Sequence, residues 1–318
     1  MATTLSANEA QHVLEYVEQH RDAFPGGGRL AVTLHREVYL STLYKVARDG
    51  QLFLLAIKHH DPSAARARRE YEVLSVLGSS LSARPVLFDD SRSWFADPIL
   101  VTTFERPSFV KTWTDVHLAR LAQVMAAIHT NDDLLDLPID RGRPRSYSLL
   151  REFDDEMVDV PSFRDTPLRR TLLDVAEVLR ERIPRWETAF ADGPVTYIHS
   201  DLPHSHLFAV EPQWKTVHWE WSRRSHPSRE LARAFWDMDL PPDRERLLVD
   251  QYLALVPYTI TGEALETQRL LQYFYNCVHV AFWLDRTEQD PESATWRKAE
   301  RLAAVVRLWI QMRLEQAA

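Results

Sequence analysis

Hydrophobic and polar residues alternate in several short runs in the first third of the chain. Segments of this kind that are rich in Val, Leu, Ile and Tyr predict β-strands, because side chains in a strand point alternately to two faces. Asp49-Gly50 lies between two of these runs and indicates a hairpin turn. We expect strands at 30–34, 38–46, 52–58, 85–88 and 99–103.

Helical periodicity dominates the rest of the chain. Asp61 as N-cap and Pro62 at the first helical position begin a predicted helix that runs to Leu77, where Gly78 ends it. A shorter helix is expected from Ser6 to about His20. Further amphipathic helices are expected at 116–129, 168–190, 229–238, 244–255, 262–286 and 293–316.

This order of elements predicts an α+β fold with two lobes. A β-rich N-terminal lobe would span residues 1–104, and an α-helical C-terminal lobe would span 105–318. A pair of strands within 195–220 interrupts the helices. Two-lobed chains of this kind usually bind their ligand in the cleft between the lobes.

The composition narrows the choice of partners. The 318 residues are 45% hydrophobic and 26% charged, which is typical of a globular enzyme, and the net charge is −8. An acidic chain is not expected to bind nucleic acid. No signal peptide or membrane-spanning run is evident, and the single cysteine, Cys277, fits a reducing cytoplasm.

The segment around Asp201 is the strongest candidate for chemistry. An apolar lead-in, Val195 to Ile198, delivers His199 and Asp201, and a second apolar pair follows at 207–208. This pattern presents a carboxylate from a tight loop between two buried strands.

A second candidate pairs a strand with a helix. Lys58 closes the apolar strand that ends at Ile57, and Glu70 falls on the apolar stripe of the next predicted helix. Because a buried carboxylate requires a partner, Lys58 is the obvious one. Glu72 points to the opposite face, which is expected to be solvated.

These motifs resemble the protein kinase fold, and in particular the aminoglycoside phosphotransferase and choline kinase families. The matching elements are His199-x-Asp201, the later segment Val217-His-Trp-Glu220 and the Lys58–Glu70 pair. The resemblance implies a nucleotide-dependent phosphotransferase that uses ATP or GTP and a small-molecule hydroxyl acceptor.

The resemblance also implies individual roles. Asp201 would accept the proton of the attacking hydroxyl, and His199 would support its loop. Lys58 and Glu70 would position phosphates, and the backbone from Thr102 to Phe104 would bind the nucleotide base.

The expected metal site departs from the family pattern. His206 stands in place of an Asn, and His218 in place of an Asp. Magnesium prefers oxygen ligands, whereas imidazole suits transition metals and, less well, manganese. Three arrangements remain open, besides a pocket that is simply filled by packed histidines. Glu220 supplies the missing carboxylate on the same strand face as His218, the cluster binds a transition metal, or protonated histidines bind an anion without metal.

The phosphate-binding hairpin departs as well, because no glycine lies between the first two strands. Arg36 or Ser41 would have to contact a phosphate instead. Downstream, Glu230 occupies the acidic position of a structural Pro-x-x-acid-Leu-Ala segment, and His129 is expected to pack or to cap a helix.

The acceptor side offers two interpretations. Acidic residues are frequent between 131 and 160, which suits either a cationic acceptor or a solvated acidic loop. Three functions follow from the whole pattern: a small-molecule phosphotransferase with an altered metal site, a catalytically silent kinase-like binding protein, or an enzyme that uses the same cleft for other chemistry. The pattern distinguishes neither ATP from GTP nor one oligomeric state from another.

Overall fold

The computed structural model describes residues 7–104, 108–110, 112–140, 146–202, 207–210 and 213–286. Contacts divide the chain into two compact units. The first comprises Met1–Arg120, Asn131–Gly142 and Asp201–Ser222, and the second comprises Leu121–Thr130, Arg143–Ser200 and Arg223–Ala318. The division is therefore less simple than the expected boundary between residues 104 and 105, because two later segments group with the N-terminal sheet.

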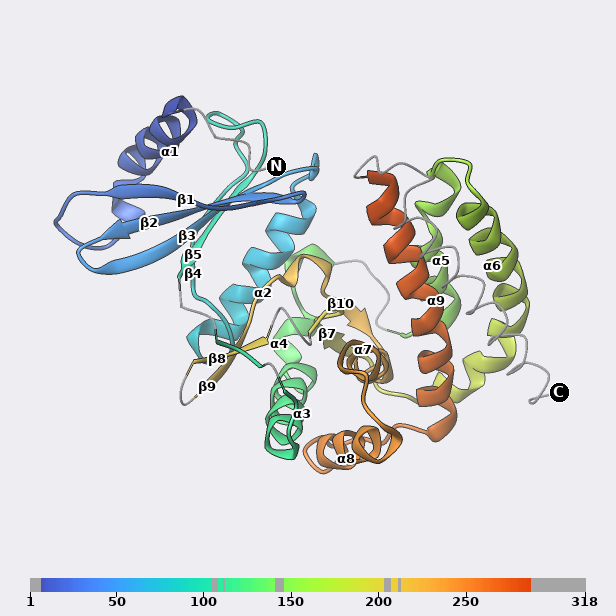
Figure 1. Ribbon diagram of the computed structural model, residues 1–318. Coiled ribbons are helices and arrows are strands. Elements are labelled where there is room, and N and C mark those ends of the chain that lie inside the picture. Colours follow the sequence, from blue (N-terminus) through green and yellow to red (C-terminus); the bar gives the residue numbers. More distant parts are fainter. Residues whose placement is uncertain are drawn as a thin grey trace. The chain divides into compact units, whose positions relative to one another are not determined.

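The first unit is built on a five-stranded antiparallel sheet (Figure 1). Its strand order is β1-β2-β3-β5-β4, with β1 (Ala31–Val38), β2 (Ser41–Arg48), β3 (Gln51–Lys58), β4 (Pro85–Asp89) and β5 (Ile99–Thr103). All five predicted strands are confirmed. Asp49 and Gly50 both have positive φ, at 48° and 76°, as the predicted hairpin turn requires.

The two faces of this sheet have different roles. Phe53, Leu55 and Ile57 of β3 point into a hydrophobic core that includes Val13 and Tyr16 of α1 (Ala7–Gln19). The alternate residues of β3, which end in Lys58, point to the opposite face. Lys58 there meets a side chain of α2 (Ala65–Leu81), so the two helices serve opposite faces of the sheet.

The start of α2 corrects the predicted cap. The helix begins at Ala65 rather than at Pro62, and Ala64 before it has a left-handed φ of 56°. Asp61 still contributes, because its Oδ2 accepts a hydrogen bond of 2.9 Å from the amide of Ala67. Gly78, with φ of 62°, interrupts the last part of α2 instead of ending it.

The described part of the first unit also contains three short strands and a short helix. They are β6 (Ser108–Phe109), β8 (Leu207–Val210) and β9 (Gln213–Thr216), which form a sheet in the order β6-β8-β9, and α4 (Asp132–Leu135). Helix α3 (Asp115–His129) begins in the first unit and ends in the second.

The second unit is largely helical. It contains α5 (Leu149–Met157), α6 (Pro167–Trp186), α7 (Ser228–Met238), α8 (Pro242–Leu253), α9 (Gly262–Arg286) and the antiparallel pair β7 (Thr196–Ile198) and β10 (Arg223–Ser225). Phe274 and Tyr275 of α9 are fully buried in its core. These elements confirm the predicted α+β class, whereas the helix expected at 293–316 lies outside the described residues.

Helix α5 was not predicted. Its acidic residues made the segment resemble a loop, yet Leu149, Phe153 and Met157 recur every four residues and are buried. The hydroxyl of Ser148 caps the helix by accepting from the amide of Arg151. Among the described helices, none combines the length and the hydropathy that a membrane span requires.

His226 is a buried histidine whose protonation should make the stability of the second unit depend on pH. Its ring lies 5.0 Å from that of Phe190 and 5.7 Å from that of Tyr147, measured between centroids. Nδ1 contacts the hydroxyl of Ser228 at 2.6 Å, and a Cβ on Gly193 would lie 2.6 Å from Nε2. Burial lowers the pKa of His226 to about 4.

The pKa of this histidine predicts a loss of stability in mild acid. In the unfolded chain His226 takes up its proton near pH 6.5, whereas in the folded chain it resists protonation until about pH 4. Its contribution is therefore present above pH 6.5 and is lost as the pH falls, by about 3 kcal/mol at pH 4. Urea unfolding at several pH values should show that His226→Gln removes this part of the slope. His60→Gln, at an exposed position, should retain it, and an unchanged slope in His226→Gln would contradict the assignment.

Candidate functional site

A buried ion pair joins the sheet of the first unit to α2. Lys58 is 8% exposed and Glu70 is 6% exposed, and Lys58 Nζ lies 2.5 Å from Glu70 Oε2. The pair that the sequence predicted therefore forms. Its low exposure makes it unlike a surface salt bridge, because neither charge is solvated enough to stand alone.

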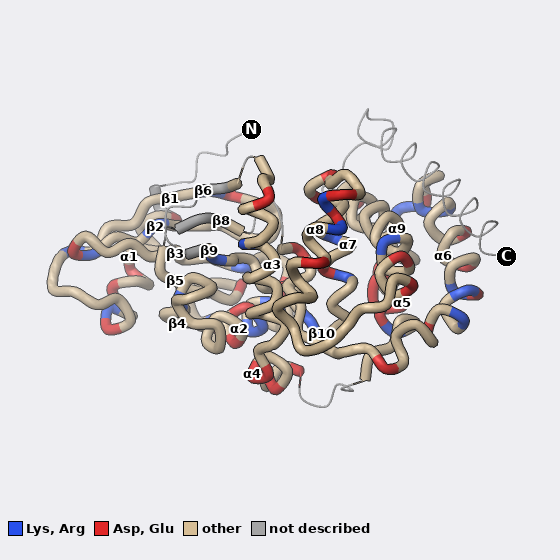
Figure 2. The backbone as a smooth tube through the Cα atoms, turned by 90° about the horizontal axis from the view of Figure 1, so that it is seen from below, with Lys and Arg blue, Asp and Glu red and all other residues tan. Residues whose placement is uncertain are grey.

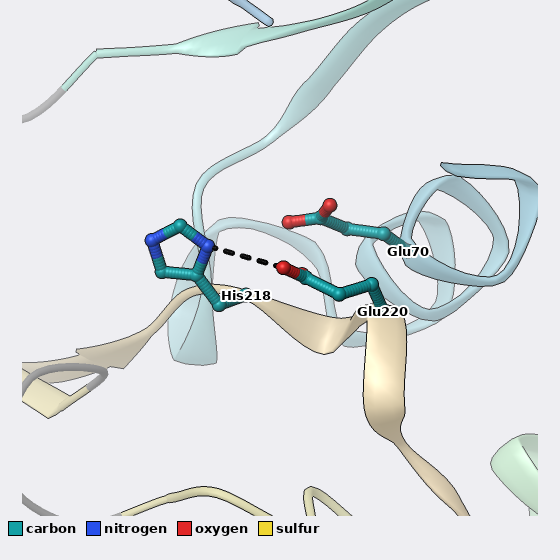
Figure 3. A group of neighbouring side chains, drawn as sticks. All are labelled: Glu70, His218 and Glu220. Atoms are coloured by element: carbon teal, nitrogen blue, oxygen red, sulfur yellow. Dashed lines mark ion pairs between the residues drawn. The ribbon is translucent and has the colours of Figure 1, made fainter. Parts of the chain in front are cut away.

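A second carboxylate approaches the same ammonium group. Glu220 Oε2 lies 3.8 Å from Lys58 Nζ and has no hydrogen-bond partner among the described residues. Figure 3 shows the carboxylates of Glu70 and Glu220 pointing toward the ring of His218, whose Nδ1 lies 3.5 Å from Glu220 Oε1. The ammonium group of one buried lysine thus interacts with two buried carboxylates.

The charges of this cluster shift the pKa values of Lys58 and Glu220. Burial opposes the charge of Lys58, but Glu220 and Glu70 together outweigh it and raise the pKa of the lysine. Burial alone would also raise the pKa of Glu220, yet Lys58, followed by His218, holds that pKa well below its usual range. Both groups are therefore charged at neutral pH.

His218 and Glu220 meet because of a turn rather than a strand. The predicted common strand face is wrong, since the strand ends at Thr216 and residues 219–221 form a 3₁₀ turn. His218 before this turn has a left-handed φ of 66°, which redirects the chain and brings its ring back toward Glu220.

This turn is fixed to the end of α2. The hydroxyl of Thr216 donates to the carbonyl of Leu81 at 2.8 Å, and Trp219 Nε1 donates to the same hydroxyl oxygen at 3.2 Å. Trp219 is fully buried. These contacts hold Glu220 at the helix that carries Glu70.

Glu70, His218 and Glu220 can present one ligand atom each within 4.8 Å of one another. Two carboxylate oxygens and an imidazole nitrogen are donors that suit Mn²⁺ or Zn²⁺ better than Mg²⁺. Lys58 Nζ lies 2.5 Å from Glu70 Oε2 but 3.8 Å from Glu220 Oε2, so Glu220 and His218 are the better placed donors. The residues present thus fit a divalent cation.

Glu230 organises the approach to Asp201. Its carboxylate accepts hydrogen bonds from the amides of His199, at 3.2 Å, and Ser200, at 2.9 Å. His129 Nε2 lies 2.8 Å from Glu230 Oε2, and both side chains are fully buried. Burial would raise the pKa of Glu230, but contact with His129 lowers it.

The half-buried Asp201 therefore follows a backbone whose last two amides are fixed. Ser200 has a left-handed φ of 74°, which turns the chain immediately before Asp201. The sequence suggested a structural role for Glu230 and packing or capping for His129, but it did not reveal their pairing. The two residues lie 101 positions apart, so no local pattern in the sequence connects them.

The remaining predicted site residues occupy varied positions. Ser41 is buried opposite Lys58 in the β2–β3 register, whereas Arg36 is exposed in β1. Thr102 is 7% exposed within β5. The amide of Phe104 donates to Leu52 at 2.9 Å, so a nucleotide base would have to compete for it or use another backbone group.

The hairpin between β1 and β2 turns through two residues, Tyr39 and Leu40. It has no glycine, in agreement with the sequence. His206, the other histidine expected at the metal site, lies outside the described residues.

Two residues of the acidic region, Asp154 and Glu156 of α5, form ion pairs with arginines, and Figure 2 marks the acidic positions along α5. The side chain of Glu156 is 5% exposed and lies 2.7 Å from both Arg223 and Arg229. Asp154 lies 2.5 Å from Arg180. A solvated acidic loop is thus wrong for Glu156, because its charge is neutralised inside the second unit.

Glu72 also differs from its expected solvated position. It is half-buried, and its Oε2 accepts a hydrogen bond of 2.9 Å from the amide of Ile139. It therefore attaches the backbone at Ile139 to α2, while Glu70 alone of the two glutamates meets Lys58.

No protein-family model and no curated protein matches the sequence. Solved structures match over nearly the whole chain. A choline kinase from Cryptosporidium parvum Iowa II is 15% identical, with a TM-score of 0.68 over 96% of this chain and 97% of that one. The macrolide 2′-phosphotransferase MphH from Brachybacterium faecium is 16% identical, with a TM-score of 0.60 over 92% and 97%.

A third match is the GDP and kanamycin complex of APH(2″)-IIIa, which is 13% identical with a TM-score of 0.63 over 93% and 99% of the two chains. At these identities the similarity is one of fold. The chain has the protein kinase-like fold of the aminoglycoside phosphotransferase and choline kinase group, as its motifs predicted.

Removal of the Glu230 carboxylate should destabilise the protein strongly. Glu230→Ala leaves two amides and a buried histidine without their acceptor, so we expect a loss of about 3–5 kcal/mol in the free energy of unfolding. Urea denaturation measures this loss. Glu263→Ala, at an exposed glutamate in the first turn of α9, should change stability by less than about 0.5 kcal/mol. Equal effects in the two variants would contradict the role of Glu230.

Proposed function

We propose that the protein is a nucleotide-dependent phosphotransferase that acts on a hydroxyl group of a small molecule. The observation that carries this proposal is the buried trio of Lys58, Glu70 and Glu220, in which one ammonium group lies between two carboxylates. A lysine held in this way is a fixed positive charge suited to nucleotide phosphates. The matched structures, which include a choline kinase and a macrolide 2′-phosphotransferase, support the class of acceptor.

The sheet carries an apolar strip beside this charge. Leu43, Ala56 and Leu100 are register partners on β2, β3 and β5, so their side chains share the face that carries Lys58. An apolar strip that ends in a lysine suits a flat base at one end and phosphates at the other. This arrangement favours ATP or GTP as donor without choosing between them.

Asp201 is the proposed general base. It lies in the same compact unit as Lys58 and Glu220, and the two residues before it have their amides fixed by Glu230. Its carboxylate would orient the acceptor hydroxyl and take its proton as the phosphoryl group transfers. His199, fully buried, supports the loop rather than reacting.

Glu220 and His218 would hold a divalent cation, with Glu70 completing the cluster if it releases Lys58. When bound, such an ion neutralises phosphate charge and aligns the transferring group. The imidazole favours Mn²⁺ or Zn²⁺ over Mg²⁺ as the preferred ion.

A silent nucleotide-binding protein is the second candidate. The substitution of a histidine at position 218 and the hairpin without glycine favour it, because both alter positions that serve phosphoryl transfer in the resembling families. The retained Asp201 favours transfer, since a binding protein needs no base.

Asp201→Asn separates these two functions. If the protein is a phosphotransferase, the variant should lose about a hundredfold or more in turnover with a panel of hydroxyl acceptors, while its nucleotide affinity stays nearly unchanged. Product formation is followed by mass spectrometry of the phosphorylated acceptor. Equal turnover in both proteins would remove Asp201 from the mechanism, and no turnover in either would leave the binding function.

Glu220→Gln tests the cation. The change keeps the shape of the side chain but removes its charge, so metal-dependent nucleotide binding should weaken about tenfold or more. Glu72→Gln, a glutamate on the same helix as Glu70 that bonds to a backbone amide instead, is the matched control and should bind as the parent does. Metal dependence that persists in Glu220→Gln would exclude this residue as a ligand.

A further inference from the structure

Three side chains in the first unit, away from the Lys58 cluster, form a continuous hydrogen-bond chain. Thr42 Oγ1 lies 2.8 Å from His59 Nε2, and His59 Nδ1 lies 2.7 Å from Asp97 Oδ2. A hydroxyl, an imidazole and a carboxylate are thus linked in the order that activates a nucleophile.

The proton positions follow from the chemistry of each group. An ionised carboxylate only accepts, so Nδ1 of His59 must donate to Asp97. A neutral ring then has its lone pair on Nε2, which accepts the hydroxyl proton of Thr42. This is the tautomer in which the imidazole can act as general base toward Thr42.

His59 and the segment that carries Asp97 have further hydrogen bonds that hold them. The amide of His59 donates to the carbonyl of Leu40 at 2.8 Å, which fixes the imidazole beside the start of β2. Arg92 bonds to the carbonyl of Ala96, next to Asp97, and to that of Pro62 at 2.8 Å. Backbone hydrogen bonds thus fix the position of His59, and contacts of the Arg92 side chain hold the loop that carries Asp97.

The chain is accessible and separate from the proposed phosphotransferase site. His59 and Asp97 have side chains that are each 30% exposed, and Thr42 is half-buried. Thr42 follows Ser41, the register partner of Lys58, so its side chain points to the other face of the sheet. A reagent that reaches Thr42 would therefore approach from the face opposite Lys58.

We propose that Thr42 is an activated hydroxyl that accepts acyl groups from activated esters and thioesters, with His59 as general base and Asp97 as its positioning residue. Thr42 Oγ1 attacks the carbonyl carbon, and a new Oγ–C bond forms. The bond from this carbon to the alkoxide or thiolate leaving group breaks, and the hydroxyl proton passes to His59 Nε2 and from there to the leaving group or water. No oxidant or reductant takes part.

The test is acetylation of the full-length protein by p-nitrophenyl acetate, followed by intact mass and peptide mapping. Thr42 should acquire an acetyl group faster than the other hydroxyl residues. His59→Gln keeps a polar side chain of similar reach but accepts no proton, so labelling of Thr42 should slow about a hundredfold. Thr42→Ser removes the hindering methyl group and should label faster than the parent.

Controls separate activation from simple exposure. Ser41→Ala changes the neighbouring hydroxyl on the opposite face and should leave labelling unchanged, whereas Thr42→Val should abolish it at this site. Thermal unfolding of each variant confirms that the fold is retained. The proposal would be overturned if position 42 remained unlabelled in both the parent and Thr42→Ser. It would also be overturned if Thr42 were labelled at the parent rate in His59→Gln. Neither result bears on nucleotide binding, since Thr42 and Lys58 occupy opposite faces.

Discussion

The charge of Lys58 is the constraint on which the first unit depends. An ammonium group at the buried end of a strand is costly unless carboxylates accompany it, and both Glu70 and Glu220 do so. Glu70 reaches it from α2, and Glu220 reaches it from a turn attached to the same helix through Thr216 and Trp219. The charge of Lys58 thus links the sheet, the helix and the turn, while uncharged hydrogen bonds of Thr216 and Trp219 fix the turn to the helix.

That balance of charge is incomplete, and the proposed function rests on this imbalance. One lysine offsets two buried carboxylates, and the half-exposed His218 lies beside the second of them. Glu220 Oε2 has no hydrogen bond within the described part of the chain. Surplus buried negative charge and an unbonded oxygen are the features that support the proposed cation, and the neighbouring lysine supports the proposed binding of phosphates.

The sequence predicted the strands and the Lys58–Glu70 pair because both follow from local periodicity. It predicted that Glu220 lies beside His218, but it assigned this to a common strand face. The left-handed conformation of His218 depends on how the turn is anchored, and a hydrophobic pattern does not reveal it. Helix α5 was missed because the buried Glu156 looks solvated until its partners are known. These partners, Arg223 and Arg229, lie more than sixty residues away. The role of Glu230 required the same kind of long-range contact.

The most direct test of the central claim is calorimetric titration of ATP and GTP into the purified protein, first without metal and then with Mg²⁺, Mn²⁺ and Zn²⁺ in turn. The charge arrangement predicts nucleotide binding that requires a divalent ion and is strongest with Mn²⁺ or Zn²⁺. Binding of neither nucleotide under any of these conditions would contradict the account, and the similarity to phosphotransferases would then be one of fold alone.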